Sequence, residues 1–308
     1  MVERSAAPLT SQAPLGLGAI ALAATLWALG AVVASSLFDD GVQPLELAEA
    51  RSVVAALGLA LIPGSWRPPA EKPSRAVRKS LVVLGICIGL VNAVYYVAID
   101  RLPVAVALVL QYTAPAMVVV YTAARLKRRP GNEVLVAVLL ALTGVALVSG
   151  AIGADLGSVD ALGVAMGLAS AVLFASYTLI GENVTRAYGP LGAMFRAFTI
   201  AGSLWLCWQI FNGFPHELLD LANLPRVLMV GLGATLAPFL LYLWGVERVK
   251  AERAAIAATL EPVLGAVVAW ILLDQSLAAL QIAGGMLVIA AVILIQTGRS
   301  KPVLTPEL

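Results

Sequence analysis

The sequence predicts an all-α integral membrane protein: ten transmembrane helices, arranged as two inverted five-helix repeats around a central cavity. Hydrophobic residues make up 60% of the 308 positions and charged residues only 12%, whereas soluble domains carry about 25% charged residues. The apolar residues form ten stretches of roughly bilayer length. The second half of the chain also repeats the first at one constant offset.

The ten stretches predict ten spans, which form two repeats between an N-terminal and a C-terminal tail. A helix needs about 20 mainly apolar residues to cross a bilayer. The first stretch is longer than the roughly 7–15 apolar residues of a signal peptide, so we expect it to be retained. The predicted spans are 15–38, 42–63, 77–99, 102–125, 132–151, 158–181, 190–211, 225–246, 251–272 and 277–297. The predicted parts are an N-terminal tail (1–14), a first repeat (15–151), a second repeat (152–297) and a C-terminal tail (298–308).

The placement of basic residues predicts the orientation. Cytoplasmic loops of membrane proteins are enriched in Lys and Arg. With the N-terminus inside, all but four of the 20 basic residues fall on the inner side. The exceptions are Arg101 and Arg226 in outer loops, and Arg51 and Arg196 within spans. Ten spans then place both termini in the cytoplasm. Arg51 and Arg196 are expected to be neutralised or to reach toward the membrane faces, and a role in gating is the alternative.

A shift of 147 residues lays the second half of the chain on the first. Pro115 falls opposite Pro262, since 262 − 115 = 147, and Tyr95 falls opposite Tyr242. Each half holds an odd number of spans, so the two copies are expected to face opposite ways across the membrane. Inverted repeats are frequent in secondary transporters. The alternative is a duplicated scaffold without transport.

Pro115 and Pro262 lie inside the fourth and ninth spans. A proline within a helix removes one backbone hydrogen bond and kinks the helix. We predict a pair of hinges, one per repeat, and static packing kinks are the alternative.

Glu261 is the only acidic residue deep within a span. Carboxylates in the membrane often mark transport pathways or proton relays, so Glu261 is a candidate coupling residue, or else a neutral group that bonds a carbonyl freed by Pro262.

Polar and aromatic residues recur at helical spacing on several spans. Lipid-facing surfaces have no use for Asn or Gln, so these faces are expected to line the cavity and bind substrate; packing between helices is the alternative for each aromatic ring. The candidate substrate-binding residues are Trp27, Asn92, Tyr95, Tyr96, Gln111, Tyr112, Phe174, Tyr177, Thr178, Phe239 and Tyr242.

Other kinds of site find no support in the sequence. There is no phosphate-binding G-x-x-x-x-G-K-[ST] loop and no H-E-x-x-H motif, and the single histidine, His216, makes a His-based metal site improbable. We predict no enzyme activity, no catalytic residues, no metal and no cofactor. The expected partners are a small-molecule substrate and the lipid bilayer, with no nucleic acid, and the chain is expected to be a monomer or a homodimer.

Three motifs resemble those of a known family. They are Leu26-Trp27-Ala28, the Tyr112…Pro115 span, and Glu261-Pro262-Val263 followed by Asp274. Together with the paired prolines they resemble the drug/metabolite transporter superfamily, EamA type, over residues 15–297. The family usually has Glu where this chain has Asp274.

The overall form is similar to the YddG-type amino acid exporters of bacterial inner membranes. The resemblance implies a ten-helix basket and a secondary transporter that exports amino acids, including aromatic and other neutral ones, by alternating access. Exporters of other small metabolites, sugars or cationic drugs are the alternative.

Overall fold

The computed structural model describes residues 12–102, 104–127, 129–151, 160–213, 215, 218, 220–273 and 277–297. Most of the two tails, and Asp274, lie outside these ranges. Within them every regular element is helical and no strand occurs. The elements are α1 (Ala13–Asp39), α2 (Pro44–Leu61), α3 (Arg75–Arg101), α4 (Val104–Gln111), α5 (Ala114–Leu126), α6 (Asn132–Val148), α7 (Ala161–Asn212), α8 (Leu224–Leu228), the π-helix η3 (Met229–Leu236), α9 (Ala237–Val249), α10 (Ala251–Ala258), α11 (Leu260–Leu273) and α12 (Ala279–Thr297).

Five of the described helices are long and apolar enough to cross a membrane, judged by length and composition. They are Ala13–Phe38, Arg75–Ile99, Val106–Leu126, Ala161–Asn212 and Leu224–Val249. Two shorter apolar helices span Asn132–Val148 and Ala279–Ile295. The helix α2 carries Glu46, Glu49 and Arg51, which lowers its hydropathy. The structure therefore supports a membrane protein, and the count of ten spans stays a prediction.

The long element α7 contains two helices joined at Gly189. This glycine has φ 70° and ψ 158°, a conformation open to glycine because it has no Cβ. Pro190 follows, and its fixed φ suits the first turn of a new helix. The sequence predicted that the sixth span ends at residue 181. The helix instead continues to the break, and Glu182 and Arg186 form an i,i+4 ion pair of 3.0 Å on the added turns.

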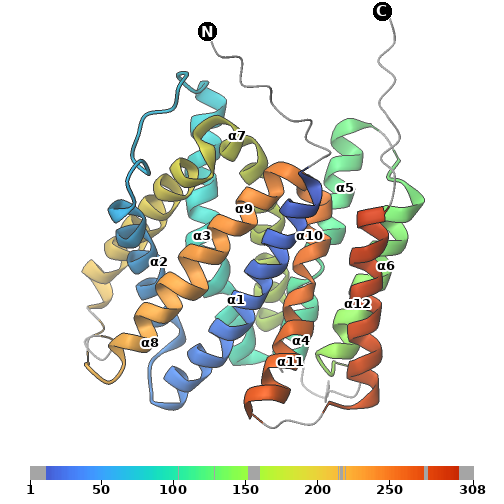
Figure 1. Cartoon of the computed structure of the whole chain (residues 1–308). Helices are drawn as coiled ribbons and strands as arrows, with labels where there is room; N and C mark the ends of the chain where they lie inside the picture. Colours follow the sequence, from blue (N-terminus) through green and yellow to red (C-terminus); the bar gives the residue numbers. More distant parts are fainter. Residues whose placement is uncertain are drawn as a thin grey trace, which may run out of the picture.

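The elements run alternately between the two ends of the bundle. The start of α1 and the end of α12 lie at one end, together with the loop between α2 and α3 and the junction between α9 and α10 (Figure 1). The end of α3 and the start of α8 lie at the opposite end (Figure 1). The two outer-loop arginines of the sequence analysis therefore belong to the end away from the first turn of α1.

Equivalent contacts hold the two halves of the chain together. A Cβ added to Gly16 of α1 would lie 2.8 Å from Cγ1 of Val249 and 2.9 Å from Cβ of Arg248. A Cβ added to Gly163 of α7 would lie 2.7 Å from Cγ of Leu102 and 3.0 Å from Cβ of Arg101. Each position of the first contact maps onto the second by 147 residues (163 − 16 = 248 − 101 = 249 − 102 = 147). The halves thus pack as two copies of one unit, and each copy offers a glycine to the other.

Helices α6 and α12 pack through a second set of small residues. A Cβ added to Gly144 would meet the carbonyl oxygen of Gly284 at 2.7 Å, and one added to Gly284 would meet the carbonyl oxygen of Gly144 at 2.7 Å. Small residues let helix backbones approach closely in membranes, where packing replaces the hydrophobic effect as the source of association. This contact joins the last helix of each half.

Candidate functional site

A cavity of about 350 Å³ lies in the middle of the bundle. Elements of both halves form its wall, from α1, α2, α3 and α4 to α7, η3, α9 and α11. Nine residues singled out from the sequence line it, namely Trp27, Asn92, Tyr95, Tyr96, Gln111, Phe174, Tyr177, Phe239 and Glu261. The polar face predicted on α3, formed by Asn92, Tyr95 and Tyr96, therefore points into one shared space.

The cavity extends toward one end of the bundle. It follows α1 from Trp27 to Phe38 and α3 from Val91 to Ile99. Both stretches lead toward the end of the bundle away from the first turn of α1 (Figure 1). On the other side of the cavity α1 packs closely against α9, as the contact of Gly16 with Val249 shows.

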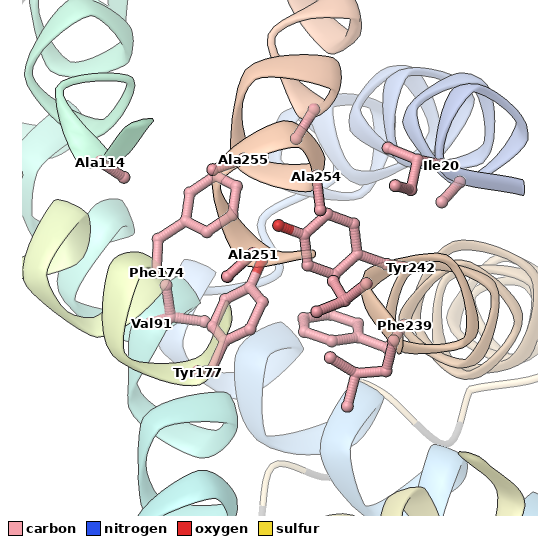
Figure 2. Close-up of a cluster of buried hydrophobic side chains, with 14 of the residues drawn as sticks. Ile20, Val91, Ala114, Phe174, Tyr177, Phe239, Tyr242, Ala251, Ala254 and Ala255 are labelled. Atoms are coloured by element: carbon pink, nitrogen blue, oxygen red, sulfur yellow. The ribbon is translucent and has the colours of Figure 1, made fainter. Parts of the chain in front are cut away.

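Aromatic rings form a continuous cluster beside the cavity. Phe174 and Tyr177 of α7 stack with centroids 5.1 Å apart, and Phe239 and Tyr242 of α9 project toward them (Figure 2). Trp27 contacts both α9 rings, at 5.4 Å and 5.5 Å. Edge-to-face and offset pairs of this kind add to the packing energy of the buried area. The cluster is a rigid aromatic wall shared by α1, α7 and α9.

Three sequence-predicted residues lie outside the cavity lining. Tyr112 is only 1% exposed and uses its hydroxyl to donate a hydrogen bond to Glu261. Thr178 and Tyr242 are both fully buried, and their hydroxyl oxygens lie 3.0 Å apart. These three residues support the aromatic wall, because the hydroxyl group of each one contacts a neighbouring side chain.

Glu261 lies beside a helix break, with its carboxylate in the cavity lining. A single turn residue, Thr259, separates α10 from α11 with its backbone still in the right-handed region (φ −65°, ψ −5°), and the Thr259 hydroxyl donates to the Ile256 carbonyl at 2.6 Å. Oε2 of Glu261 accepts a hydrogen bond of 2.7 Å from Tyr112. Ionisable groups at membrane depth are expensive and usually face a polar cavity or a partner; Glu261 has both.

The fourth predicted span breaks in the same way. Residues 112–113 separate α4 from α5, and the Thr113 hydroxyl donates to the Leu110 carbonyl at 2.6 Å. Pro115 follows this break as Pro262 follows the other. Interrupted helices are therefore present beside both prolines, as expected from the sequence, and hinge motion at them stays a prediction.

The cavity also contains a cation, which the sequence predicts to be neutralised or to reach toward a membrane face. Arg51 of α2 is buried, with 8% exposure. Its Nε donates to Oγ1 of Thr235 at 2.7 Å, and its Nη2 donates to the carbonyl of Ala234 at 3.1 Å. Nη1 donates to the hydroxyl of Tyr96 at 3.3 Å. An arginine inside an apolar stretch was the only signal in the sequence, and its two partners on η3 lie 183 and 184 residues further along the chain.

The local structure of η3 explains these acceptors. Pro238 has no backbone N–H, so the carbonyl of Ala234, four residues earlier, loses its α-helical donor. The wide turns of the π-helix let the Thr235 hydroxyl donate to the carbonyl of Val230 at 2.7 Å. π-Helical turns are rare and frequently occur at functional sites. The Ala234 carbonyl and the Thr235 hydroxyl therefore act as acceptors at the place where Arg51 reaches η3.

Among the described residues, no group of three His, Cys, Asp or Glu side chains is arranged to hold a metal ion. The polar groups of the cavity are instead one guanidinium, one carboxylate, amides and phenols. Such a site can bind a small polar molecule by hydrogen bonds and charge.

Comparison with known proteins assigns the chain to a family. The profile of the EamA-like transporter family matches residues 14–150 and again residues 161–297. This chain belongs to the EamA-like transporter family. The two matches are themselves 147 residues apart (161 − 14 = 147), which is the offset of the internal repeat. The resemblance drawn from the sequence is therefore confirmed, and the chain is a membrane transporter with two copies of one domain.

Relatives of this EamA-like transporter include known exporters. The threonine/homoserine exporter RhtA of Salmonella typhimurium (strain LT2) is 27% identical over 277 residues, covering 85% of this chain and 84% of the relative. RhtA of Escherichia coli (strain K12) is 27% identical over 272 residues with the same coverage. The uncharacterized transporter YwfM of Bacillus subtilis (strain 168) is 26% identical over 248 residues, covering 79% of this chain and 80% of the relative.

A solved structure shares the fold of this transporter. A crystal structure superposes with a TM-score of 0.73 at 18% sequence identity, and the match covers 92% of this chain and 96% of that one. At this identity the likeness concerns the fold alone.

Proposed function

We propose that this EamA-like transporter exports amino acids, including aromatic and other neutral ones, across the bacterial inner membrane. The observation that carries the proposal is the central cavity, which both repeats build and which holds one cation, one carboxylate and several aromatic rings. Such a lining suits a small molecule that has charge and an apolar part. The relationship to the threonine/homoserine exporters RhtA supports the same substrate class.

The proposed mechanism is alternating access between two inverted five-helix repeats with ten transmembrane segments. The structure supplies the candidate segments if α4–α5, α8–η3–α9 and α10–α11 each count as one and α7 counts as two. Basic residues gather at the end where α1 starts, which supports cytoplasmic termini by the positive-inside rule. The cavity then extends toward the outer side. The breaks beside Pro115 and Pro262 would allow the outer and inner helix halves to bend.

We further propose that Glu261 couples transport to protons. Its carboxylate lines the cavity and is held by Tyr112. A carboxylate that faces the cavity can bind either a proton or a positively charged group of the substrate. Protonation and substrate binding can therefore compete at one group.

Other cargoes agree less well with the lining. A cationic drug would place its positive charge in the same cavity as Arg51. A sugar offers no charge to compensate either Arg51 or Glu261, which would remain unpaired in a medium of low dielectric. Free amino acids carry both charges and meet neither objection.

The test is counterflow in proteoliposomes loaded with threonine, homoserine, phenylalanine or glucose, with methylviologen as the cationic drug. We expect uptake of labelled amino acid only into vesicles loaded with an amino acid. Ala31 lines the cavity, so Ala31→Trp should block counterflow by filling it, whereas Leu57→Trp on the exposed face of α2 should not. Counterflow of glucose or methylviologen, with none of any amino acid, would overturn the proposal.

A further inference from the structure

The cavity holds two opposite charges that are not paired with each other. Arg51 and Glu261 both line it, yet none of the ion pairs within 4.0 Å among the described residues includes either group. Separate neighbours fix the two side chains. Arg51 is anchored on η3, and Glu261 is anchored through Tyr112 at the α4–α5 break.

Arg51 retains hydrogen-bonding capacity after these contacts. A guanidinium has five N–H donors in a planar fork. Three of them bond to Thr235, Ala234 and Tyr96, which leaves two, one on each terminal nitrogen. A guanidinium that presents one N–H from each terminal nitrogen matches the two oxygens of a carboxylate.

Glu261 is satisfied on one side only. Tyr112 donates to Oε2, and within the described part of the chain no donor reaches Oε1. Glu261 is part of the cavity lining, and we assign Oε1 as the oxygen that it offers to a bound molecule. A carboxylate oxygen beside aromatic rings suits an ammonium group, which bonds to the oxygen and is attracted to ring faces.

We propose that Arg51 binds the α-carboxylate and Glu261 the α-ammonium group of the substrate, so that the cavity selects free zwitterionic amino acids. This inference rests on the proposed export of amino acids. It adds a recognition rule, namely which residue binds each charged group of the substrate. A zwitterion brings a counter-charge to both groups, whereas an amino acid ester or a des-amino acid leaves one of them unpaired. Unpaired charges in the interior are costly, and this cost is the physical source of the selectivity.

The rest of the lining fits the variable side chain. Trp27, Val91 and Phe239 offer apolar surface, and the described residues of the lining include no charged group besides Arg51 and Glu261. A volume of about 350 Å³ is at the low end for small-molecule sites, which favours one amino acid over a peptide. Charge selects the backbone of the substrate, and the apolar wall tolerates several neutral side chains.

The experiment measures competition against labelled amino acid counterflow with two matched sets of compounds. One set is phenylalanine, its methyl ester and 3-phenylpropionate, and the other is threonine, its methyl ester and 3-hydroxybutyrate. We expect wild-type protein to prefer the free amino acid over the ester and over the des-amino acid by roughly tenfold to a hundredfold, the scale of one charged hydrogen bond. Arg51→Gln should abolish the preference over the ester alone, and Glu261→Gln the preference over the des-amino acid alone.

Structural damage is separated from recognition by a neighbouring variant. Arg51 also holds η3, so its loss can lower stability. Thr235→Val removes the acceptor of Nε and leaves the guanidinium in place; it should lower the melting temperature and keep the preference over the ester. If Arg51→Gln does not fold, Arg51→Lys serves in its place, because it keeps the charge and loses the fork, and it should reduce the preference.

Two outcomes would overturn the recognition rule, and a third concerns the function itself. A folded Arg51→Gln variant that keeps the full wild-type preference over the ester would show that Arg51 is structural only, while amino acid export stands; if that variant does not fold, an Arg51→Lys variant with the full preference would show that the guanidinium fork does not select the carboxylate. A folded Glu261→Gln variant that keeps the full preference over the des-amino acid would likewise overturn the role of Glu261. A wild-type protein that moves no amino acid would refute the proposed function.

Discussion

Tyr112 donates a 2.7 Å hydrogen bond to Oε2 of Glu261, and this bond joins the break between α4 and α5 to the break near the start of α11. The two residues belong to different repeats and lie beside the two prolines. The bond therefore links the two interrupted helices at the wall of the cavity. Its removal should affect both stability and transport.

Tyr112→Phe removes this bond and leaves the ring in place. Tyr112 is 1% exposed, and an unsatisfied buried acceptor costs about 1–3 kcal/mol. We expect a lower melting temperature in detergent and slower amino acid counterflow. Tyr121→Phe is the matched control, because Tyr121 is 54% exposed and a surface change of this kind stays within about 0.5 kcal/mol. Equal melting temperatures for the two variants would contradict this role of Tyr112.

The glycine contacts between the halves predict a second pair of variants. Gly16→Ala and Gly163→Ala would place a methyl group 2.7–3.0 Å from atoms of the opposite half. Overpacking of this kind costs about 1–3 kcal/mol, and the two losses should be similar because the contacts are equivalent. Gly18→Ala is the control, since its Cβ would meet nothing within 4 Å. Thermal melting checks the three variants, and stability unchanged by either contact variant would argue against the equivalent packing.

The hinge hypothesis predicts a kinetic effect of the two prolines. Pro115→Ala and Pro262→Ala restore a backbone N–H and should let the helices continue through the breaks. We expect slower counterflow and little change in the substrate concentration that gives half-maximal counterflow. The double variant should lose more of the rate than either single variant. Pro130→Ala, in the loop before α6, is the control. Wild-type rates in the double variant would show that the prolines are static kinks.

Proton coupling predicts a specific change in Glu261→Gln. Export by the wild-type protein should respond to an imposed pH gradient, because a proton binds the carboxylate when the substrate leaves. The amide of Gln cannot titrate, so the variant should exchange substrate without a response to the gradient. Glu71→Gln, in the exposed loop between α2 and α3, should respond as the wild type does. A gradient response retained in Glu261→Gln would end the coupling hypothesis.

Much of this architecture follows from local patterns in the sequence. Periodic polar faces predicted that Asn92, Tyr95 and Tyr96 share one space, and they line the cavity. The paired prolines predicted breaks in the fourth and ninth spans, because a missing backbone N–H acts within one helical turn. The constant offset predicted two copies of one unit, and the family match repeats at the same offset.

Long-range partners could not be predicted in this way. Arg51 was expected near a membrane face, since nothing close to it in sequence accounts for a buried guanidinium. Two of its acceptors, Thr235 and the carbonyl of Ala234, lie on the π-helix η3, where Pro238 removes the α-helical donor of that carbonyl. Tyr112 and Tyr242 were expected at the cavity surface. The hydroxyl group of Tyr112 instead donates to Glu261, and the hydroxyl group of Tyr242 lies beside that of Thr178. Helical spacing gives the face of a residue and does not give the partner that faces it.

The proposed transport mechanism depends on the inverted duplication, because the duplication supplies both the shared cavity and the inward-open and outward-open states. The loop between α2 and α3 and the turn before α8 join corresponding helices of the two repeats and lie at opposite ends of the bundle (Figure 1). Ala70 and Ala222 are exposed residues in these two segments. The measurement is labelling of Ala70→Cys and Ala222→Cys by a membrane-impermeant thiol reagent, in a background where Cys87 and Cys207 are replaced. We predict that Ala222→Cys is labelled from outside in intact cells and Ala70→Cys only after the cytoplasmic face is opened; labelling of both from the same side would contradict the inverted arrangement and the transport mechanism built on it.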